Sequence, residues 1–192
     1  PRFKIGYTFD VNQTEGKPLV ELSQQLTGEL TDSQKELKDA LLQISPIPVS
    51  FQPIEGSANG FYSLDKNAIT VDSTLSEKQS VKTLIHEIAH ATIHNINIPD
   101  APKDSPTREV QAESIAYVVC QYFGMDVSDY SFGYIAGWST GKDTKELKES
   151  LEIIRDTSND IISKTEQTLT QMQSVKQKVS ETIQPKRRGR CM

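Results

Sequence analysis

Two histidines spaced four residues apart constrain this 192-residue chain more than any other feature of its sequence. His86-Glu87-Ile88-Ala89-His90 is an HExxH motif, and the third and last histidine of the chain, His94, follows it closely. Side chains four apart on a helix share a face, so His86 and His90 predict a helix that directs two imidazoles at one metal ion. Glu87 lies beside that face, where its carboxylate can take a proton from a zinc-bound water. The alternative is a pair of solvated histidines on an amphipathic helix.

The residues around the motif predict the helix that the motif requires. Apolar side chains recur at three- and four-residue steps over residues 77–95 and form one broad face. Ser76 is a good N-cap, and Gln79 stands at its third following position, as in a capping box. On an unbroken helix His94 lies eight residues, or about 12 Å, beyond His86, too far to close the same site. We therefore interpret His94 as a helix-end residue or an outer neighbour of the metal.

A catalytic zinc needs a third protein ligand, and a second predicted helix supplies two candidates. This helix begins near Pro106 or Thr107 and stops at Gly124, and it carries Glu109 and Glu113 on one face. A helix–loop–helix return can bring one carboxylate to the metal, while the other accepts a hydrogen bond from a ligand histidine. We predict that Glu109 is the ligand and Glu113 the hydrogen-bonding neighbour, with the reverse assignment as the alternative.

Hydrophobic patterning elsewhere predicts a small sheet and two further helices, hence an α+β fold. The predicted strands are residues 3–11, 49–54 and the arms of a hairpin, 60–64 and 68–72. The predicted helices are 20–43, with a possible break at 28–32 where Asp32 caps a second piece, and a long polar helix over 144–183. A short element is expected at 134–138. We expect the second hairpin arm to be the sheet edge beside the motif helix, where a substrate peptide can add as a strand.

Composition limits the setting in which the chain works. The net charge is −5, and four basic residues without acidic neighbours lie in the last seven positions: Lys186, Arg187, Arg188 and Arg190. Without them 17 basic residues face 26 acidic ones, a charge of −9, which argues against nucleic-acid binding by the body of the chain. No apolar run is long enough to span a bilayer, no signal peptide is evident, and the two cysteines form no disulfide framework. We expect a cytoplasmic protein.

Four segments in order resemble a known family. They are Phe9 to Thr14, the HEIAH helix, Arg108 to Ala116 with its Glu-x-x-x-Glu spacing, and Tyr134 to Trp138. Together they resemble the zincin-like metallopeptidase domains of the IrrE/ImmA group. They are most similar to ArdC antirestriction proteins and to LtrC-like proteins of conjugative mobile elements in Gram-positive bacteria. The resemblance implies a gluzincin-type domain with a small sheet, an active-site helix, a second ligand helix and one zinc ion per chain.

The resemblance also implies a domain organisation and partners. We expect a zincin-like domain over residues 1–155, a C-terminal helical extension over 156–184 and a basic tail over 185–192. A single-stranded-DNA-binding domain precedes this domain in ArdC-like proteins, and because the chain begins at Pro1 we expect that domain to be missing from it. DNA contact is therefore expected through such an upstream domain or through the basic tail.

The predicted function is hydrolysis of peptide bonds in a protein or peptide substrate by a zinc-bound water, with His86, His90 and Glu109 (or Glu113) holding the metal. Glu87 acts as general base and then as general acid. Tyr117, Tyr130 and Tyr134 are candidates for stabilising the oxyanion. The alternative function is a non-hydrolytic, zinc-stabilised module that binds DNA or a restriction protein of the host.

Overall fold

The structure, a computed structural model, describes residues 25–95, 105–127 and 144–183. Its elements are α1 (Asp32–Ile44), β1 (Val49–Gln52), β2 (Gly60–Ser63), β3 (Ala68–Asp72), α2 (Glu77–Ile93), α3 (Ser105–Tyr122) and α5 (Thr144–Ile183). The predicted mixture of helices with a small sheet is confirmed. The predicted strand at 3–11, the element at 134–138 and the tail at 185–192 lie outside the described residues, as do Tyr130 and Tyr134.

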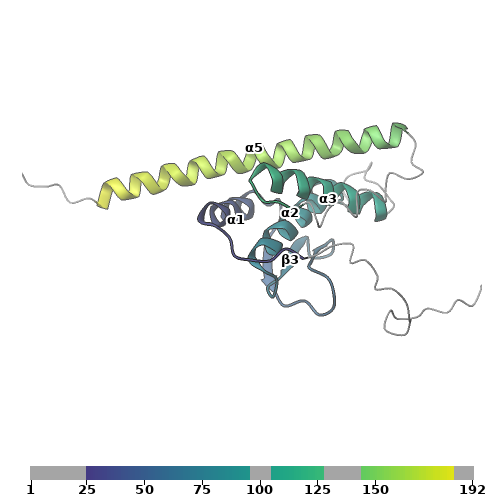
Figure 1. The fold of residues 1–192 in the computed structure, drawn as a ribbon, viewed down its shortest axis with the longest axis horizontal. Helices are drawn as coiled ribbons and strands as arrows, with labels where there is room; N and C mark the ends of the chain where they lie inside the picture. The colour runs from purple at the N-terminus through teal and green to yellow at the C-terminus, as the bar shows by residue number, and fades with distance from the viewer. Residues whose placement is uncertain (1–24, 96–104, 128–143, 184–192) are drawn as a thin grey trace, which may run out of the picture.

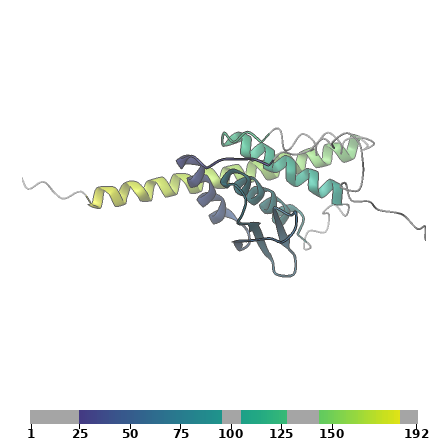
Figure 2. The ribbon, with the colours of Figure 1, turned by 60° about the horizontal axis from the view of Figure 1, so that its bottom comes forward.

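Helix α2 lies at the centre of the molecule and separates the sheet from the other helices (Figure 1). It packs against β2 and β3 on one side and against α3 on the other, while α5 crosses over α1 and α3. Figure 2 shows the β2–β3 hairpin projecting on the side of α2 away from α5. The core between these layers consists of branched aliphatic side chains, among them Leu41, Ile69, Leu84, Ile88 and Ile115.

The sheet has three strands in the order β1-β3-β2. The predicted hairpin is confirmed: β2 pairs antiparallel with β3, with Gly60 opposite Val71 and Ser63 opposite Ala68. The prediction that β3 is the sheet edge is wrong, because β1 pairs parallel with its other side, with Val49 opposite Ile69. This central place explains why β3 carries the fully buried side chains of the sheet. The edge strand next to α2 is β2.

A helix is predicted from residue 20, but the described part of the segment before α1, residues 25–30, is not helical. Residues 25–30 instead run along the start of α2, whose first side chains accept their backbone N–H groups. Glu77 Oε2 accepts from Leu30 N at 2.7 Å, and Gln79 Oε1 accepts from Leu26 N at 2.9 Å. Gln79 therefore does not close the predicted capping box of Ser76, although its own N–H donates to the Ser76 hydroxyl.

The N-cap of helix α1 lies one residue earlier than predicted. Thr31, rather than Asp32, is the N-cap: its hydroxyl accepts from Gln34 N, and the Gln34 side chain accepts from Thr31 N. Such a reciprocal capping box satisfies two backbone donors that the first helical turn leaves without intrahelical partners. The helix ends at Ile44, before the Pro46 and Pro48 segment.

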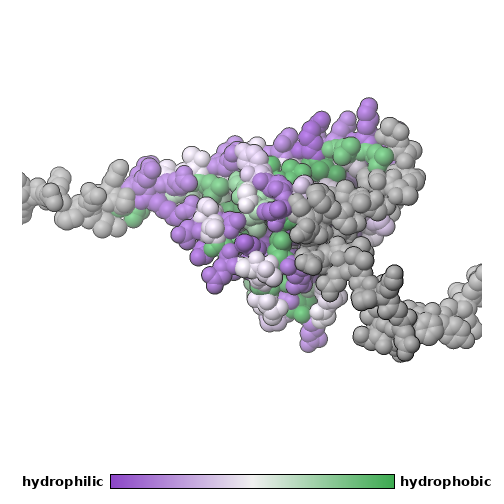
Figure 3. Space-filling model, in the orientation of Figure 1, coloured by the Kyte–Doolittle hydropathy of each residue, from purple (hydrophilic) through white to green (hydrophobic). Residues whose placement is uncertain are grey.

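Helix α5 is the longest element, with 40 residues. It buries Ile154, Ile161 and Ile162 against the body, whereas Val175 and Val179, near its far end, are more than half exposed. Hydrophilic residues predominate along the upper edge of Figure 3, where α5 lies. No helix within residues 25–95, 105–127 and 144–183 combines the length and the apolar character that a bilayer span needs.

Gly60 allows β2 to pass closely over α2. A Cβ at this position would lie 2.7 Å from Thr83 Cγ2 and 3.0 Å from the Thr70 carbonyl oxygen. We expect Gly60→Ala to lower the free energy of unfolding by about 1–3 kcal/mol, because both neighbours are packed and the strand must move. Urea unfolding measures the change. Ser57→Ala, at an exposed position in the preceding loop, is the control, and equal stability of the two variants would contradict the close approach.

Candidate metal centre

The packing of α3 against α2 brings three potential metal ligands together. His86 and His90 share one face of α2, and their Nε2 atoms lie 3.1 Å apart. Glu109, from the first turn and a half of α3, places Oε2 3.5 Å from His86 Nε2 and Oε1 3.6 Å from His90 Nε2. Within the described residues, these three side chains form a group whose ligand atoms all lie within 4.8 Å of one another.

The spacing of these atoms suits a tetrahedral zinc ion. Ligand atoms at the usual 2.0–2.1 Å from such an ion are about 3.3 Å apart, close to the separations among His86, His90 and Glu109. Two imidazoles and one carboxylate are also a donor set that zinc takes in catalytic sites, where a fourth position stays open. The Glu109 side chain is 49% exposed, so the group lies at the surface of a cavity rather than in a closed core.

Glu113 lies one turn farther along α3 and makes different contacts. Its Oε2 is 3.2 Å from Nδ1 of His86, the ring nitrogen that faces away from the ligand group. The distance is that of an ion pair. Lys82, one turn before His86 on α2, places Nζ 2.5 Å from the same oxygen, and both side chains of this pair are 3% exposed. Glu113 thus contacts His86 from outside the group of three potential ligands.

The carboxylates of α3 favour positive charge at His86. Burial disfavours the charged imidazole, but contacts with Glu109 and Glu113 outweigh it and raise the pKa of His86 to about 9. Burial likewise opposes ionisation of Glu113, yet His86 and Lys82 lower its pKa to about 2. Hydrogen bonds with His86 and His90 hold the pKa of Glu109 far below its ordinary value. Both carboxylates are therefore ionised near neutral pH, and of the two only Glu109 belongs to the group of potential ligands.

Glu87 is buried next to the ligand group, with 6% of its surface exposed. Burial raises its pKa, and the positive charge that His86 and His90 can carry works in the opposite direction. A carboxylate whose pKa is raised accepts a proton more readily near neutral pH, as a general base requires. Glu87 and the three ligand candidates line the same cavity.

The cavity has a volume of about 480 Å³ and is partly open to solvent. Its walls come from the loop before β2, from β2 itself and from the facing sides of α2 and α3. Arg108 and Tyr62 lie in this lining, and both escaped the sequence-based prediction. Tyr117, one of the predicted oxyanion donors, lies elsewhere: it packs against the hydrophobic core and is not among the lining residues.

His94 is the C-cap residue of α2, which confirms its predicted place at the helix end. Its Nδ1 lies 2.9 Å from Nδ1 of His90, and its Nε2 lies 2.9 Å from Oε1 of Gln111. Burial lowers the pKa of His94 to about 4, so the ring is neutral near pH 7. His94 is therefore an outer neighbour of His90 and not a fourth ligand.

Lys82 and Gln111 were missed because charged and amide residues on a helix are usually solvated. One signal was available for Lys82: it stands four residues before His86, on the face that the motif already assigns to the site. Gln111 carried no comparable signal, since its partners come from α2 and α5.

Comparison with known proteins gives an uncharacterized relative but no family. The chain is 28% identical over 192 aligned residues to a Bacillus anthracis protein described as uncharacterized protein pXO2-81. The match covers 90% of this chain and 32% of that protein, so the chain spans about a third of the length of the curated relative it matches. No family model and no solved structure matches the chain.

Proposed function

We propose that this chain is a zinc-dependent metallopeptidase domain that hydrolyses peptide bonds in a protein or peptide substrate. The observation that carries the proposal is the convergence of His86, His90 and Glu109 at 3.1–3.6 Å, with the buried carboxylate of Glu87 in the same cavity. A zinc ion bound by two histidines and a carboxylate supplies Lewis acidity that activates water and polarises a carbonyl.

The residues of the chain have separate tasks in this reaction. His86, His90 and Glu109 hold the metal, and Glu113 with Lys82 holds His86 in place. Glu87 accepts the proton of the attacking water and returns it to the leaving amine. Among the described residues β2 is an edge strand of the sheet and lines the cavity, which suits an extended peptide chain.

The resemblance to ArdC-like and LtrC-like proteins extends the proposal to the biological setting. We place the domain in a mobile-element protein of the bacterial cytoplasm, with a zincin-like body over residues 1–155. Any contact with DNA is assigned to a preceding domain or to the basic tail, because the body is acidic.

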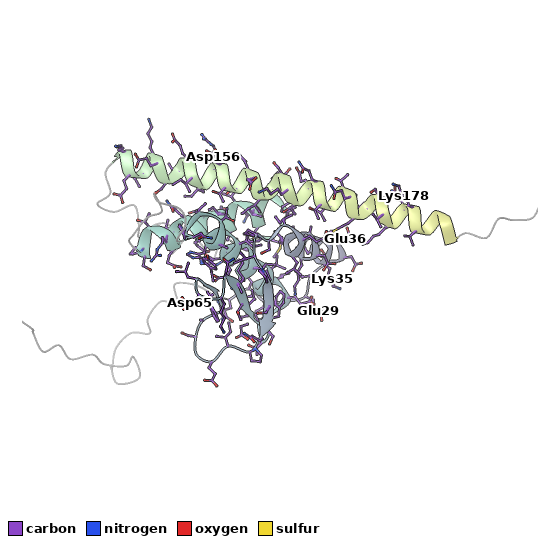
Figure 4. All side chains as sticks on the ribbon, turned by 180° about the vertical axis from the view of Figure 1, so that it is seen from behind. Glu29, Lys35, Glu36, Asp65, Asp156 and Lys178 are labelled. Atoms are coloured by element: carbon purple, nitrogen blue, oxygen red, sulfur yellow. The ribbon has the colours of Figure 1, made fainter. Side chains whose placement is uncertain are left out.

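The metal content of the purified protein tests the proposal. We expect about one equivalent of zinc per chain by mass spectrometry of the metal, and we expect Glu109→Gln to weaken zinc binding by more than about 100-fold, beyond the usual effect of an outer neighbour. Glu29→Gln, at an exposed position far from the site, is the control (Figure 4). Protein that contains no metal and takes up none when zinc is added would contradict the proposal.

A further inference from the structure

The second histidine of the motif is linked to the long C-terminal helix through three buried side chains. His90 Nδ1 lies 2.9 Å from His94 Nδ1, and His94 Nε2 lies 2.9 Å from Gln111 Oε1. Gln111 Nε2 in turn donates to Ser150 Oγ at 3.1 Å. His94, Gln111 and Ser150 are each at most 6% exposed. A continuous polar connection therefore runs from α2 through α3 to α5.

The direction of these hydrogen bonds determines which nitrogen of His90 is free. The Oε1 atom of Gln111 can only accept, so Nε2 of His94 carries the hydrogen. The Nδ1 atom of a neutral His94 then has a lone pair and accepts a hydrogen from Nδ1 of His90. His90 is left with an unprotonated Nε2, and this is the atom that faces His86 and Glu109.

The opposite orientation of the Gln111 amide would reverse every hydrogen bond. Its NH₂ group would donate to His94, His94 would donate to His90, and the hydrogen of His90 would move to Nε2. An imidazole protonated at Nε2 cannot bind a metal through that atom. In the observed orientation the Gln111 NH₂ group donates to Ser150 Oγ at 3.1 Å. A hydroxyl can also donate, so Ser150 holds the Gln111 amide in place beside His94, and the orientation of the amide then sets the tautomer.

We infer that Gln111 and Ser150 are positioning residues that act through His94 to keep His90 in its metal-binding tautomer. Helix α5 is then part of the metal site and not an extension beside it. The inference rests on the proposed metal centre, which it deepens by assigning the role of outer neighbour to a residue of α5. Outer neighbours of this kind change metal affinity by about 10- to 100-fold when they are removed.

Two substitutions and a matched control test the inference. Gln111→Met removes the acceptor of His94 and is expected to weaken zinc binding about 10- to 100-fold, measured by competition with a chromophoric chelator. Ser150→Ala is expected to weaken it about 10-fold. Ser158→Ala is the control, because Ser158 is equally buried on α5 and its Oγ has no hydrogen-bond partner among the described residues. Zinc affinities of Gln111→Met and Ser150→Ala equal to that of Ser158→Ala would overturn the inference.

The tautomer itself is observable without any enzymatic activity. Two-bond ¹H–¹⁵N correlation spectra of the full chain, with and without zinc, are expected to show His94 protonated at Nε2 and His90 protonated at Nδ1. His90 protonated at Nε2 in both spectra would overturn the inference. If the wild type binds no zinc, the proposed function fails on that measurement, and the metal-free spectrum still decides the tautomer.

Discussion

Glu87→Gln is expected to abolish peptide hydrolysis while the protein retains its zinc. The carboxylate lies in the same cavity as the ligand group without belonging to it, so its loss removes a proton acceptor and no metal ligand. General bases of this kind contribute about 10²- to 10⁴-fold to the rate. Cleavage of a quenched-fluorescence peptide library, with the zinc content of the same sample, measures both effects.

The variant should also fold at least as well as the wild type. Burial raises the pKa of Glu87 in the folded metal-free protein. The free energy of unfolding therefore falls as the pH rises above the pKa that Glu87 has in the unfolded chain. Glutamine removes that cost, and a loss of activity therefore cannot be assigned to unfolding. Glu109→Gln is the contrasting variant, since it should lose zinc and activity together.

The same substitution separates the two predicted functions. Hydrolysis at the wild-type rate by Glu87→Gln would contradict the role of Glu87 as general base. Zinc binding without hydrolysis by the wild type, combined with DNA protection that survives Glu87→Gln, would favour the non-hydrolytic module.

Lys82→Met is expected to lower the free energy of unfolding by about 3 kcal/mol, near the lower end of the cost of breaking a buried ion pair. Lys82 and Glu113 are both 3% exposed, so the substitution leaves a buried carboxylate without its ammonium partner. His86 still faces Glu113 and limits the loss. Urea unfolding of the metal-free protein measures the effect. Lys78→Met, one turn earlier on the same helix, is the control and should change stability by less than about 1 kcal/mol.

A double substitution distinguishes the charge of Glu113 from its contact with His86. Lys82→Met combined with Glu113→Gln removes both buried charges and should recover most of the stability. Zinc affinity should stay about 10-fold below the wild type, because the neutral amide holds His86 less strongly. Stability that fails to recover in the double variant would show that the ion pair is not the cause of the loss.

The pair of Lys82 and Glu113 also predicts how the stability of the wild type depends on pH. The pKa of Glu113 is about 2 in the folded protein, against an ordinary value of 4.5. Because the folded value is the lower one, ionised Glu113 contributes stability above about pH 4.5 and loses it as the pH falls towards 2.

Local spacing explains why the core of the site could be predicted. The four-residue repeat of a helix alone places His86 and His90 on one face, and the same repeat limits the third ligand to Glu109 or Glu113. The choice between Glu109 and Glu113 depends on how deeply each side chain is buried where α3 packs against α2, which local spacing does not specify. Both carboxylates line the cavity, but Glu113 is buried against Lys82, whereas Glu109 is about half exposed and lies between His86 and His90.

Non-local pairing explains what the pattern could not predict. The strand β3 resembles an edge strand in a hairpin until β1, from a distant segment, pairs with its free side. The leucine repeat before residue 31 is typical of a helix, yet Glu77 and Gln79 of α2 bind the backbone of that segment instead. The connection through Gln111 to Ser150 likewise depends on the position of α5, which its own periodicity does not specify.

The continuity of α5 has a mechanical consequence. Ser150 and Val179 belong to one uninterrupted helix, so a rod about 44 Å long joins the polar connection at the metal site to the exposed far end. Beyond residue 165 its contacts with the body include Tyr122 OH to Glu166 Oε1 at 2.7 Å and Lys176 Nζ to Glu36 Oε1 at 2.8 Å. Figure 4 shows Glu36 beneath the half of α5 that carries Lys178. Because the helix is continuous, a displacement of its far end relative to these contacts is transmitted along the rod to the turn that carries the Ser150 hydroxyl.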